Sequence, residues 1–110
     1  MPNNLTDIDS LFRTLADPTR RAVVDRLSQG PATVAELAKP FPMALPSFLQ
    51  HLGVLEKGNI ITTKKVGRVR TCYLQPEALK VIEGWLADRR TMWVRRLDAL
   101  EQYLDNDQLS

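Results

Sequence analysis

From Leu45 to Lys57 the chain reads Leu-Pro-Ser-Phe-Leu-Gln-His-Leu-Gly-Val-Leu-Glu-Lys, and this stretch decides the fold. At 100° per residue its bulky apolar side chains fall in one narrow sector, which predicts a helix with a single buried face. Those side chains are Leu45, Phe48, Leu52 and Leu55. The opposite sector holds Pro46, Ser47, Gln50, Gly53, Val54 and Lys57. Because this sector lacks apolar bulk, it is free to face something other than the core. We expect the helix to begin near Ala44 and to end before Gly58.

A shorter helix is predicted directly before this one. Thr33 followed three residues later by Glu36 is a capping box, and Pro40 ends the helix within about two turns. Two short helices joined by a few residues form the helix-turn-helix pattern.

Two more helices are predicted at the start of the chain. The first begins near Thr6 or Asp7, and the second begins at Asp17-Pro18, where the carboxylate accepts from free amides and proline loses no hydrogen bond. The second helix should end near Gly30. Inward-facing residues are expected to be Ile8, Leu11, Phe12 and Leu15 in the first helix and Ala22, Val23 and Leu27 in the second.

After Gly58 the pattern changes from helix to strand. Residues 60–63 and 69–74 are β-formers on either side of a turn candidate at residues 66–68, which predicts a two-stranded hairpin. Residues 60–74 contain Lys64, Lys65, Arg68 and Arg70 and no acidic residue. The basic tip is either a solvated loop or a surface that contacts phosphate. A hairpin of this size is marginal alone, so we expect it to pack on the helices.

A long helix from Pro76 to about Leu104 completes the chain. Its apolar stripe includes Leu86, Trp93 and Leu100 at intervals of seven residues, and it is wider than so small a domain could easily cover. We therefore expect two copies to pair through this helix and the first one, the alternative being a helix that lies on its own protomer. The expected interface residues are Leu11, Leu86, Trp93, Leu97, Leu100 and Leu104.

Composition excludes several other classes of protein. The chain has 110 residues, 44% of them hydrophobic, and a formal net charge of +2, which is typical of one globular domain. The lone cysteine, Cys72, and the lone histidine, His51, exclude an intrachain disulfide and a multi-cysteine or histidine-rich metal site. No nucleophile elbow or phosphate loop is present, so we expect no enzyme. The start, Met1-Pro2-Asn3-Asn4, lacks the features of a secretion signal and no apolar stretch is long enough to span a membrane, so a cytoplasmic location is expected.

The ordered set of motifs resembles the ArsR/SmtB-type winged-helix transcriptional regulators. The resemblance covers roughly residues 8–104. It rests on Leu15-Ala16-Asp17-Pro18-Thr19-Arg20-Arg21, Thr33-Val34-Ala35-Glu36-Leu37-Ala38, Leu45-Pro46-Ser47-Phe48-Leu49-Gln50-His51-Leu52 with Val54-Leu55-Glu56, Gly67-Arg68 and Tyr73-Leu74. The resemblance implies a mainly α winged helix-turn-helix fold and a homodimer. In that family the fourth helix enters the major groove of DNA and the wing follows the adjacent backbone.

The residues themselves agree with an approach to double-stranded DNA. The major groove accepts one helix, and the amide of Gln50 is suited to donate to and accept from an adenine edge. Basic residues of the hairpin would contact phosphate, and Thr33 is a further candidate although capping alone explains it. His51 is more typical of a packed, hydrogen-bonded histidine. The candidate DNA-contacting residues are Thr33, Leu45, Pro46, Ser47, Leu49, Gln50, His51, Lys64, Lys65, Arg68 and Arg70.

The chain departs from the family pattern in two places: in the helix expected to read DNA, and at the positions that bind metal in metal-sensing members. Many members have Ser or Thr before Leu45, and Ser-Lys where this chain has Leu49-Gln50, so this chain lacks one helix cap and one cationic side chain. The metal-sensing branch places cysteines in the third helix or Asp and His ligands on the last, and neither set is present. We therefore expect no metal and no cofactor, and leave an unidentified effector open. Cys72 is interpreted as a small packed hydrophobe, with a redox switch as the alternative.

The sequence therefore predicts a single domain over residues 1–110, with the helix-turn-helix and wing at 6–75 and a dimerisation helix at 76–104. The predicted function is sequence-specific transcriptional regulation, as a repressor that binds an inverted repeat as a homodimer. A protein this small has no spare domain with which to recruit polymerase. The alternative is a winged-helix protein-interaction module that has lost DNA binding.

Overall fold

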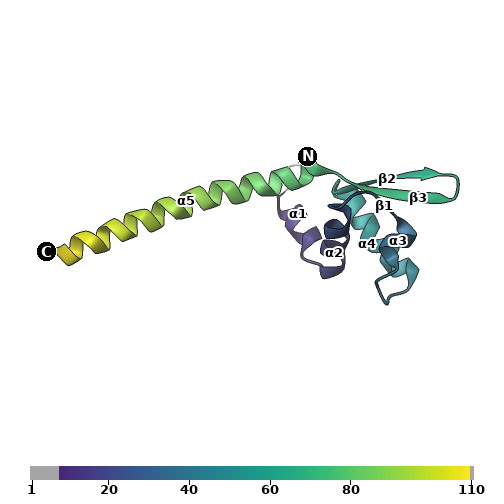
Figure 1. Cartoon of the computed structure of the whole chain (residues 1–110), viewed down its shortest axis with the longest axis horizontal. Coiled ribbons are helices and arrows are strands. Elements are labelled where there is room, and N and C mark those ends of the chain that lie inside the picture. Colours follow the sequence, from purple (N-terminus) through teal and green to yellow (C-terminus); the bar gives the residue numbers. More distant parts are fainter. Residues whose placement is uncertain (1–7, 110) are drawn as a thin grey trace.

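The computed structural model describes residues 8–109 and shows a small helical body with a hairpin at one side and a long helix leaving it at the other (Figure 1). The elements, in chain order, are α1 (Ile8–Leu15), α2 (Pro18–Leu27), β1 (Ala32–Thr33), α3 (Val34–Ala38), α4 (Leu45–Lys57), β2 (Ile61–Val66), β3 (Val69–Leu74) and α5 (Pro76–Leu109). This is the predicted winged helix-turn-helix fold. The predicted start near Thr6 or Asp7 lies outside the described residues.

The junction of α1 and α2 explains the run of residues 17–21. Asp17 caps α2 by accepting from the backbone N–H of Arg20 at 3.0 Å, with Pro18 in the first turn. The Arg20 Nε donates back to the carbonyl of Thr14 at 2.6 Å, and Arg21 donates to the carbonyls of Leu15 and Ala16, at 2.8 Å each. Residues 17–21 thus provide hydrogen-bond partners for backbone carbonyls at the end of α1 and for a backbone N–H at the start of α2.

The core lies where α1, α2 and α4 meet the sheet. Its largest fully buried side chains are Phe48, Leu11, Leu55, Ile60, Ile61, Val23 and Cys72. The predicted inward faces are largely confirmed, but three positions differ. Phe12, expected to face inward from the first helix, is 39% exposed, because its ring packs against Trp85 of α5 and not in the core. Ala22 is exposed and Val24 is buried in its place. Leu45 is 54% exposed because it opens α4 beyond the edge of the core, so it is not part of the buried face.

The sheet has three strands in the order β1-β3-β2, one more than the predicted hairpin. Ala32 pairs with Cys72, and Thr33 pairs with Thr71. Thr33 is also the N-cap of α3, with φ −75° and ψ 159°. Because an N-cap residue has extended backbone, it can end a strand and begin a helix at the same time. This pairing ties the root of the hairpin to the helix-turn-helix.

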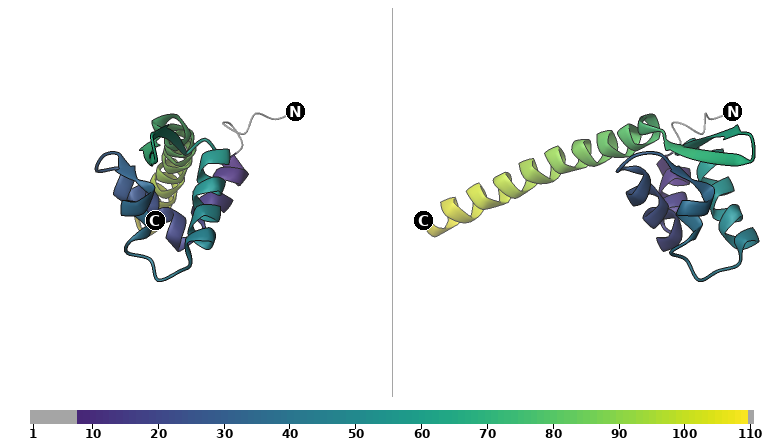
Figure 2. Two further views of the ribbon diagram at one scale, coloured as in Figure 1. Left: turned by 90° about the vertical axis from the view of Figure 1, so that its right-hand side faces the viewer. Right: turned by 45° about the vertical axis from the view of Figure 1, so that its right-hand side comes forward.

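Helix α5 gives the protein its elongated shape. Its first turns pack on the core through the buried Ala78 and the partly buried Leu79, Val81 and Ile82, and the rest extends away from the body (Figure 2). The helix runs to Leu109, five residues past the predicted end. The Cα radius of gyration is 19.8 Å, against about 13 Å for a compact domain of this length. Within residues 8–109 no helix is both long and apolar enough to cross a membrane.

Candidate nucleic-acid interface

Burial of one side of α4 fixes which of its residues face outward. Phe48, Leu52 and Leu55 are 1%, 5% and 0% exposed, so the helix cannot rotate without opening the core. Side chains on the other side are therefore presented to solvent: Leu45, Pro46, Ser47, Leu49, Gln50, Gly53 and Val54 are exposed. The predicted DNA-contacting residues among them, Leu45, Pro46, Ser47, Leu49 and Gln50, thus lie together on the outer side of the helix, in its N-terminal half.

The start of α4 has no side-chain cap. Ala44 is the N-cap residue and makes no side-chain hydrogen bond, and Pro46 lies in the first turn. Pro46 has no N–H, and the backbone N–H groups of Ser47 and Phe48 both donate to the carbonyl of Ala44 at 3.1 Å, so it is the positive end of the helix dipole that favours negative charge here. The N-terminal end of α4 is therefore suited to lie near phosphate.

His51 packs against Arg20 of α2 and against Asp17, the residue that caps α2. Its Nδ1 lies 3.2 Å from Nη1 of Arg20 and 3.6 Å from Oδ2 of Asp17, and the side chain is 23% exposed. Sequence reasoning identified His51 as packed but missed Arg20, which is 31 residues away along the chain. Arg20 and His51 line a shallow hollow together with Ser47 and Gln50. The Arg20–His51 contact therefore sets the position of α4 against α2 beside the predicted base-reading residues.

The β2–β3 hairpin, here called the wing, projects past α4 and α3 (Figure 1). Val66 pairs with Val69, so the turn consists of Gly67 and Arg68 alone. Gly67 has φ +64°, a conformation that L side chains rarely adopt, and a positive φ at the first turn residue only is typical of a type II′ turn. Arg68 is thereby presented at the tip of the wing.

The four predicted basic residues divide between the two faces of the wing. Lys65 pairs directly with Arg70, so their side chains lie on the same face, and both border the space beside α4. Lys64 lies on the other face, where its Nζ is 5.6 Å from the centroid of the Tyr73 ring. Within residues 8–109 no ion pair involves a basic residue of the wing. Their positive charge is therefore available to an anionic partner.

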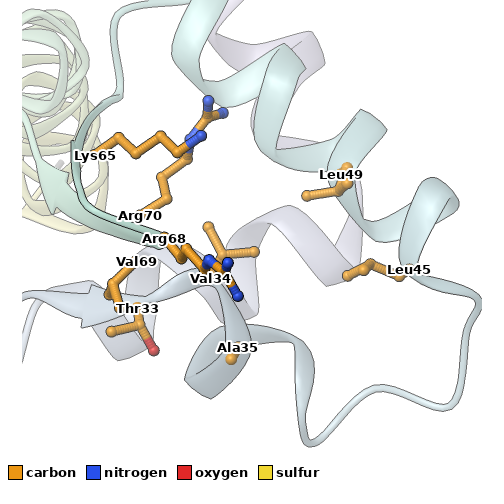
Figure 3. Close-up of a pocket in the computed structure, with 9 residues that line it drawn as sticks. All are labelled: Thr33, Val34, Ala35, Leu45, Leu49, Lys65, Arg68, Val69 and Arg70. Atoms are coloured by element: carbon orange, nitrogen blue, oxygen red, sulfur yellow. The ribbon is translucent and has the colours of Figure 1, made fainter.

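A hollow of about 700 Å³ separates the wing from the first turns of α3 and α4 (Figure 3). Basic side chains of the wing border it on one side, and Leu45 and Leu49 project from α4 on the other (Figure 3). Val34, Ala35 and Val69 complete an apolar lining that sequence reasoning did not identify. Strand alternation alone places Val69 on the face opposite Arg70, so neither its place in this lining nor that of the α3 residues could have been found from the sequence pattern.

Thr33 also borders this hollow, but its hydroxyl is already used. Thr33 Oγ1 accepts from the backbone N–H of Glu36 at 3.1 Å, and Glu36 Oε1 accepts from the backbone N–H of Thr33 at 3.3 Å, which is the predicted capping box. The Thr33 hydroxyl also donates to Glu36 Oε1 at 3.0 Å. These hydrogen bonds from Thr33 lower the pKa of Glu36. A role of Thr33 in contacting phosphate stays a prediction.

Cys72 lies at the root of the wing and not on its surface. It is 0% exposed, and burial raises the pKa of its thiol, so the reactive thiolate is disfavoured. This agrees with its interpretation as a packed hydrophobe. Among residues 8–109 no three His, Cys, Asp or Glu side chains gather in a group that could hold a metal ion.

A second surface, here called the α5 stripe, is separate from the wing. It consists of Leu86, Trp93, Leu97, Leu100 and Leu104, which are 48%, 52%, 63%, 53% and 50% exposed. Near the start of this stripe, the ring of Phe12 in α1 packs edge to face on the ring of Trp85 in α5, with 5.4 Å between the ring centroids. Leu11, the sixth predicted interface residue, is 1% exposed in the protomer's own core and does not lie on this surface.

An exposed helix in a helix-turn-helix, flanked by a basic wing, defines the class of winged helix-turn-helix proteins. Residues 15–64 match the family model described as a helix-turn-helix domain. The HTH-type transcriptional regulator Rv2034 of Mycobacterium tuberculosis is 35% identical over 99 residues, which cover 90% of each chain. The transcriptional repressor SdpR of Bacillus subtilis is 28% identical over 79 residues, 72% of this chain and 88% of that protein.

The solved structures agree with the sequence relatives. An ArsR family transcriptional regulator of known structure superposes with a TM-score of 0.74 and is 56% identical, covering 78% of this chain and 89% of that chain. The chain therefore belongs to the ArsR family of winged helix-turn-helix transcriptional regulators. This confirms the family suggested by the motifs around residues 15–21, 33–38 and 45–56.

Proposed function

We propose that this protein is a repressor that binds an inverted-repeat operator in double-stranded DNA as a homodimer. The observation that carries the proposal is the outer face of α4, held out by its buried side beside a basic wing. A helix of this kind fits the major groove of B-DNA, where each base pair presents a distinct pattern of donors and acceptors. Gln50, exposed at the centre of this face, is proposed to read an adenine edge.

The basic residues of the wing are proposed to contact the phosphate backbone. Lys65, Arg68 and Arg70 border the hollow beside α4 without ion-pair partners among residues 8–109. Such contacts fix the register of the protein on the duplex and make its affinity depend steeply on salt. Lys64 lies on the opposite face of the wing, so it would contact DNA phosphates only on that side.

The proposed homodimer is supported by the α5 stripe. The part of α5 that leaves the body carries large apolar side chains about half exposed, and an isolated apolar helix face of this length is unfavourable in water. A second copy would cover both stripes at once, because a twofold interface uses the same patch on each protomer. The operator would then be an inverted repeat with half-sites about one helical turn apart.

The names of the relatives support repression of transcription rather than activation. SdpR is named a transcriptional repressor, and two further relatives are named a biofilm growth-associated repressor and an arsenical resistance operon repressor. A dimer of 110-residue chains needs only affinity and position to occlude a promoter.

The test is selection of duplexes from a random pool, followed by fluorescence anisotropy on the selected duplex and a scrambled one at several salt concentrations. We expect an inverted repeat to be enriched, and binding to it that weakens steeply with salt. In vitro transcription from a promoter that contains the selected sequence should fall when the protein is added. No binding to either duplex at low salt would contradict the proposal and favour a protein-interaction module.

A further inference from the structure

Two leucines lie exposed on the side of α4 that is proposed to face DNA. What they contact is inferred below, and that inference rests on the proposed function. Leu45 and Leu49 are 54% and 43% exposed, although the core beside them is closed by Phe48 and Leu52. They are four residues apart on one helix, so their side chains lie next to each other, with Cβ atoms about 6 Å apart. Together they form an apolar ridge at the N-terminal end of α4.

The surroundings of this ridge restrict what can cover it. The leucines project toward the hollow whose far side carries Lys65, Arg68 and Arg70 (Figure 3). An occupant must therefore present apolar groups to α4 and negative charge to the wing at the same time. A DNA duplex does both, because base edges line its groove and phosphates line the rim of that groove.

In the major groove one apolar group stands out, the C5-methyl of thymine. We propose that Leu45 and Leu49 recognise thymine by packing on this methyl group, which makes them specificity-determining residues of the α4 face. Gln50 follows Leu49 directly on the exposed side of the helix, so an amide suited to adenine lies beside a leucine suited to thymine.

The spacing of the two leucines predicts the spacing of the thymines. A separation of about 6 Å between the leucines corresponds to about two base steps along one strand, at about 3.4 Å a step. The two thymines of a half-site are therefore one or two steps apart. This readout uses shape and burial, so it adds sequence preference without adding dependence on salt.

The experiment replaces thymine by deoxyuridine, one position at a time, in the selected duplex. Deoxyuridine pairs with adenine in the same way and lacks only the methyl group. Wild-type protein should lose about fourfold in affinity at each contacted thymine, the ratio that corresponds to burial of one methyl group, and nothing at other thymines. The loss should be the same at low and high salt.

Variants connect the effect to the ridge. In Leu49→Ala the penalty for deoxyuridine at one position should disappear, because the methyl group has already lost its partner, and Leu45→Ala should act at a second position. Val54→Ala is the matched control, since Val54 is an exposed apolar residue of the same helix, 39% exposed, that borders the hollows on the other side of α4 and not the one beside the wing. It should keep the wild-type sensitivity to deoxyuridine.

The outcomes separate this inference from the proposed function. Selective binding that is unchanged within twofold by deoxyuridine at every thymine would overturn the inference and leave the regulator intact. A deoxyuridine penalty that persists in both Leu45→Ala and Leu49→Ala would also overturn it, because other residues would then contact the methyl groups. Absence of any selective binding would overturn both.

Discussion

Nη1 of Arg20 lies 3.2 Å from Nδ1 of His51, which joins α2 to the outer helix of the helix-turn-helix. The same guanidinium donates to the carbonyl of Thr14 at 2.6 Å at the end of α1. One side chain thus links three helices at the point where α4 must be held at a fixed angle. The position of the DNA-facing surface depends on this link as well as on the core.

Arg20→Ala should therefore reduce both stability and DNA affinity. It removes the donor to the carbonyl of Thr14 and the contact with His51, and hydrogen bonds from a charged group contribute about 1.5–3 kcal/mol. We expect the free energy of unfolding to fall by about 2 kcal/mol in urea titrations. Lys39→Ala is the control, because Lys39 is an exposed residue at the end of α3 whose side chain makes no such contact with residues 8–109, and it should change stability by less than about 0.5 kcal/mol. Equal effects of the two variants would contradict the proposed role of Arg20.

Asp17 should make the stability of the protein depend on pH on the acid side. The hydrogen bond from the backbone N–H of Arg20 lowers the pKa of Asp17 below its usual 3.8, and the nearby charges of His51 and Arg20 act in the same direction. Because the folded pKa is the lower one, the stabilisation is present above about pH 4 and is lost as pH falls through the folded pKa. Asp17→Asn keeps a capping oxygen without the charge. Its free energy of unfolding should fall less than that of the wild type between pH 5 and about pH 2.5. Parallel pH profiles for the two proteins would show that Asp17 does not contribute.

Local signals explain how much of this fold could be predicted. The capping box at Thr33, the proline in the first turn of α2 and the change of periodicity after Gly58 each lie within a few residues, and each marks an element that the structure contains. Strand β1 was missed because two residues are too few to show any period, and its pairing with Cys72 and Thr71 spans the length of the wing.

In the candidate site, too, features set by local sequence could be predicted and features set by long-range packing could not. The exposure of Gln50 followed from helical periodicity alone. The exposure of Leu45 did not, because it depends on where the core ends beneath the first turn of α4, and the contact of Arg20 with His51 joins residues far apart in the chain. Periodicity gives the direction of a side chain, whereas tertiary packing decides what it meets.

Removing positive charge from the wing should weaken binding to all DNA sequences alike. With Arg68→Ala and Arg70→Ala combined, affinity for the selected and the scrambled duplex should fall in parallel, and the slope of log K against log salt should flatten by roughly 0.9 for each phosphate that the protein no longer neutralises. Arg95→Ala removes the same kind of charge from an exposed position of α5, far from the wing, and should leave the slope unchanged. A slope that stays at the wild-type value in the double variant would exclude these residues as phosphate contacts.

Gln50→Ala should reduce the preference of the protein for one DNA sequence over another and leave its general affinity for DNA unchanged. Removal of a bidentate hydrogen-bonding partner of adenine reduces discrimination against the wrong base by about 1–3 kcal/mol, or about 5- to 150-fold. Anisotropy titrations on the selected duplex and on versions with one base pair changed should show the loss at one position of each half-site. A uniform loss over all duplexes would instead mean that Gln50 contacts backbone.

The α5 stripe should determine the oligomeric state. Leu97 is 63% exposed in the protomer and would be covered by the second copy, so Leu97→Glu places a carboxylate where the interface excludes water. We expect light scattering to give about twice the chain mass of 12.5 kDa for the wild type and a single chain for Leu97→Glu at micromolar concentration. Ala99→Glu introduces the same side chain on the opposite side of α5, where it is exposed, and should remain dimeric. Because two linked half-site contacts bind far more tightly than one, Leu97→Glu should also lose about 100-fold or more in affinity for the inverted repeat while keeping its fold by circular dichroism. A wild-type protein that scatters as a single chain would contradict the homodimer and leave the exposed leucines of α5 without a partner.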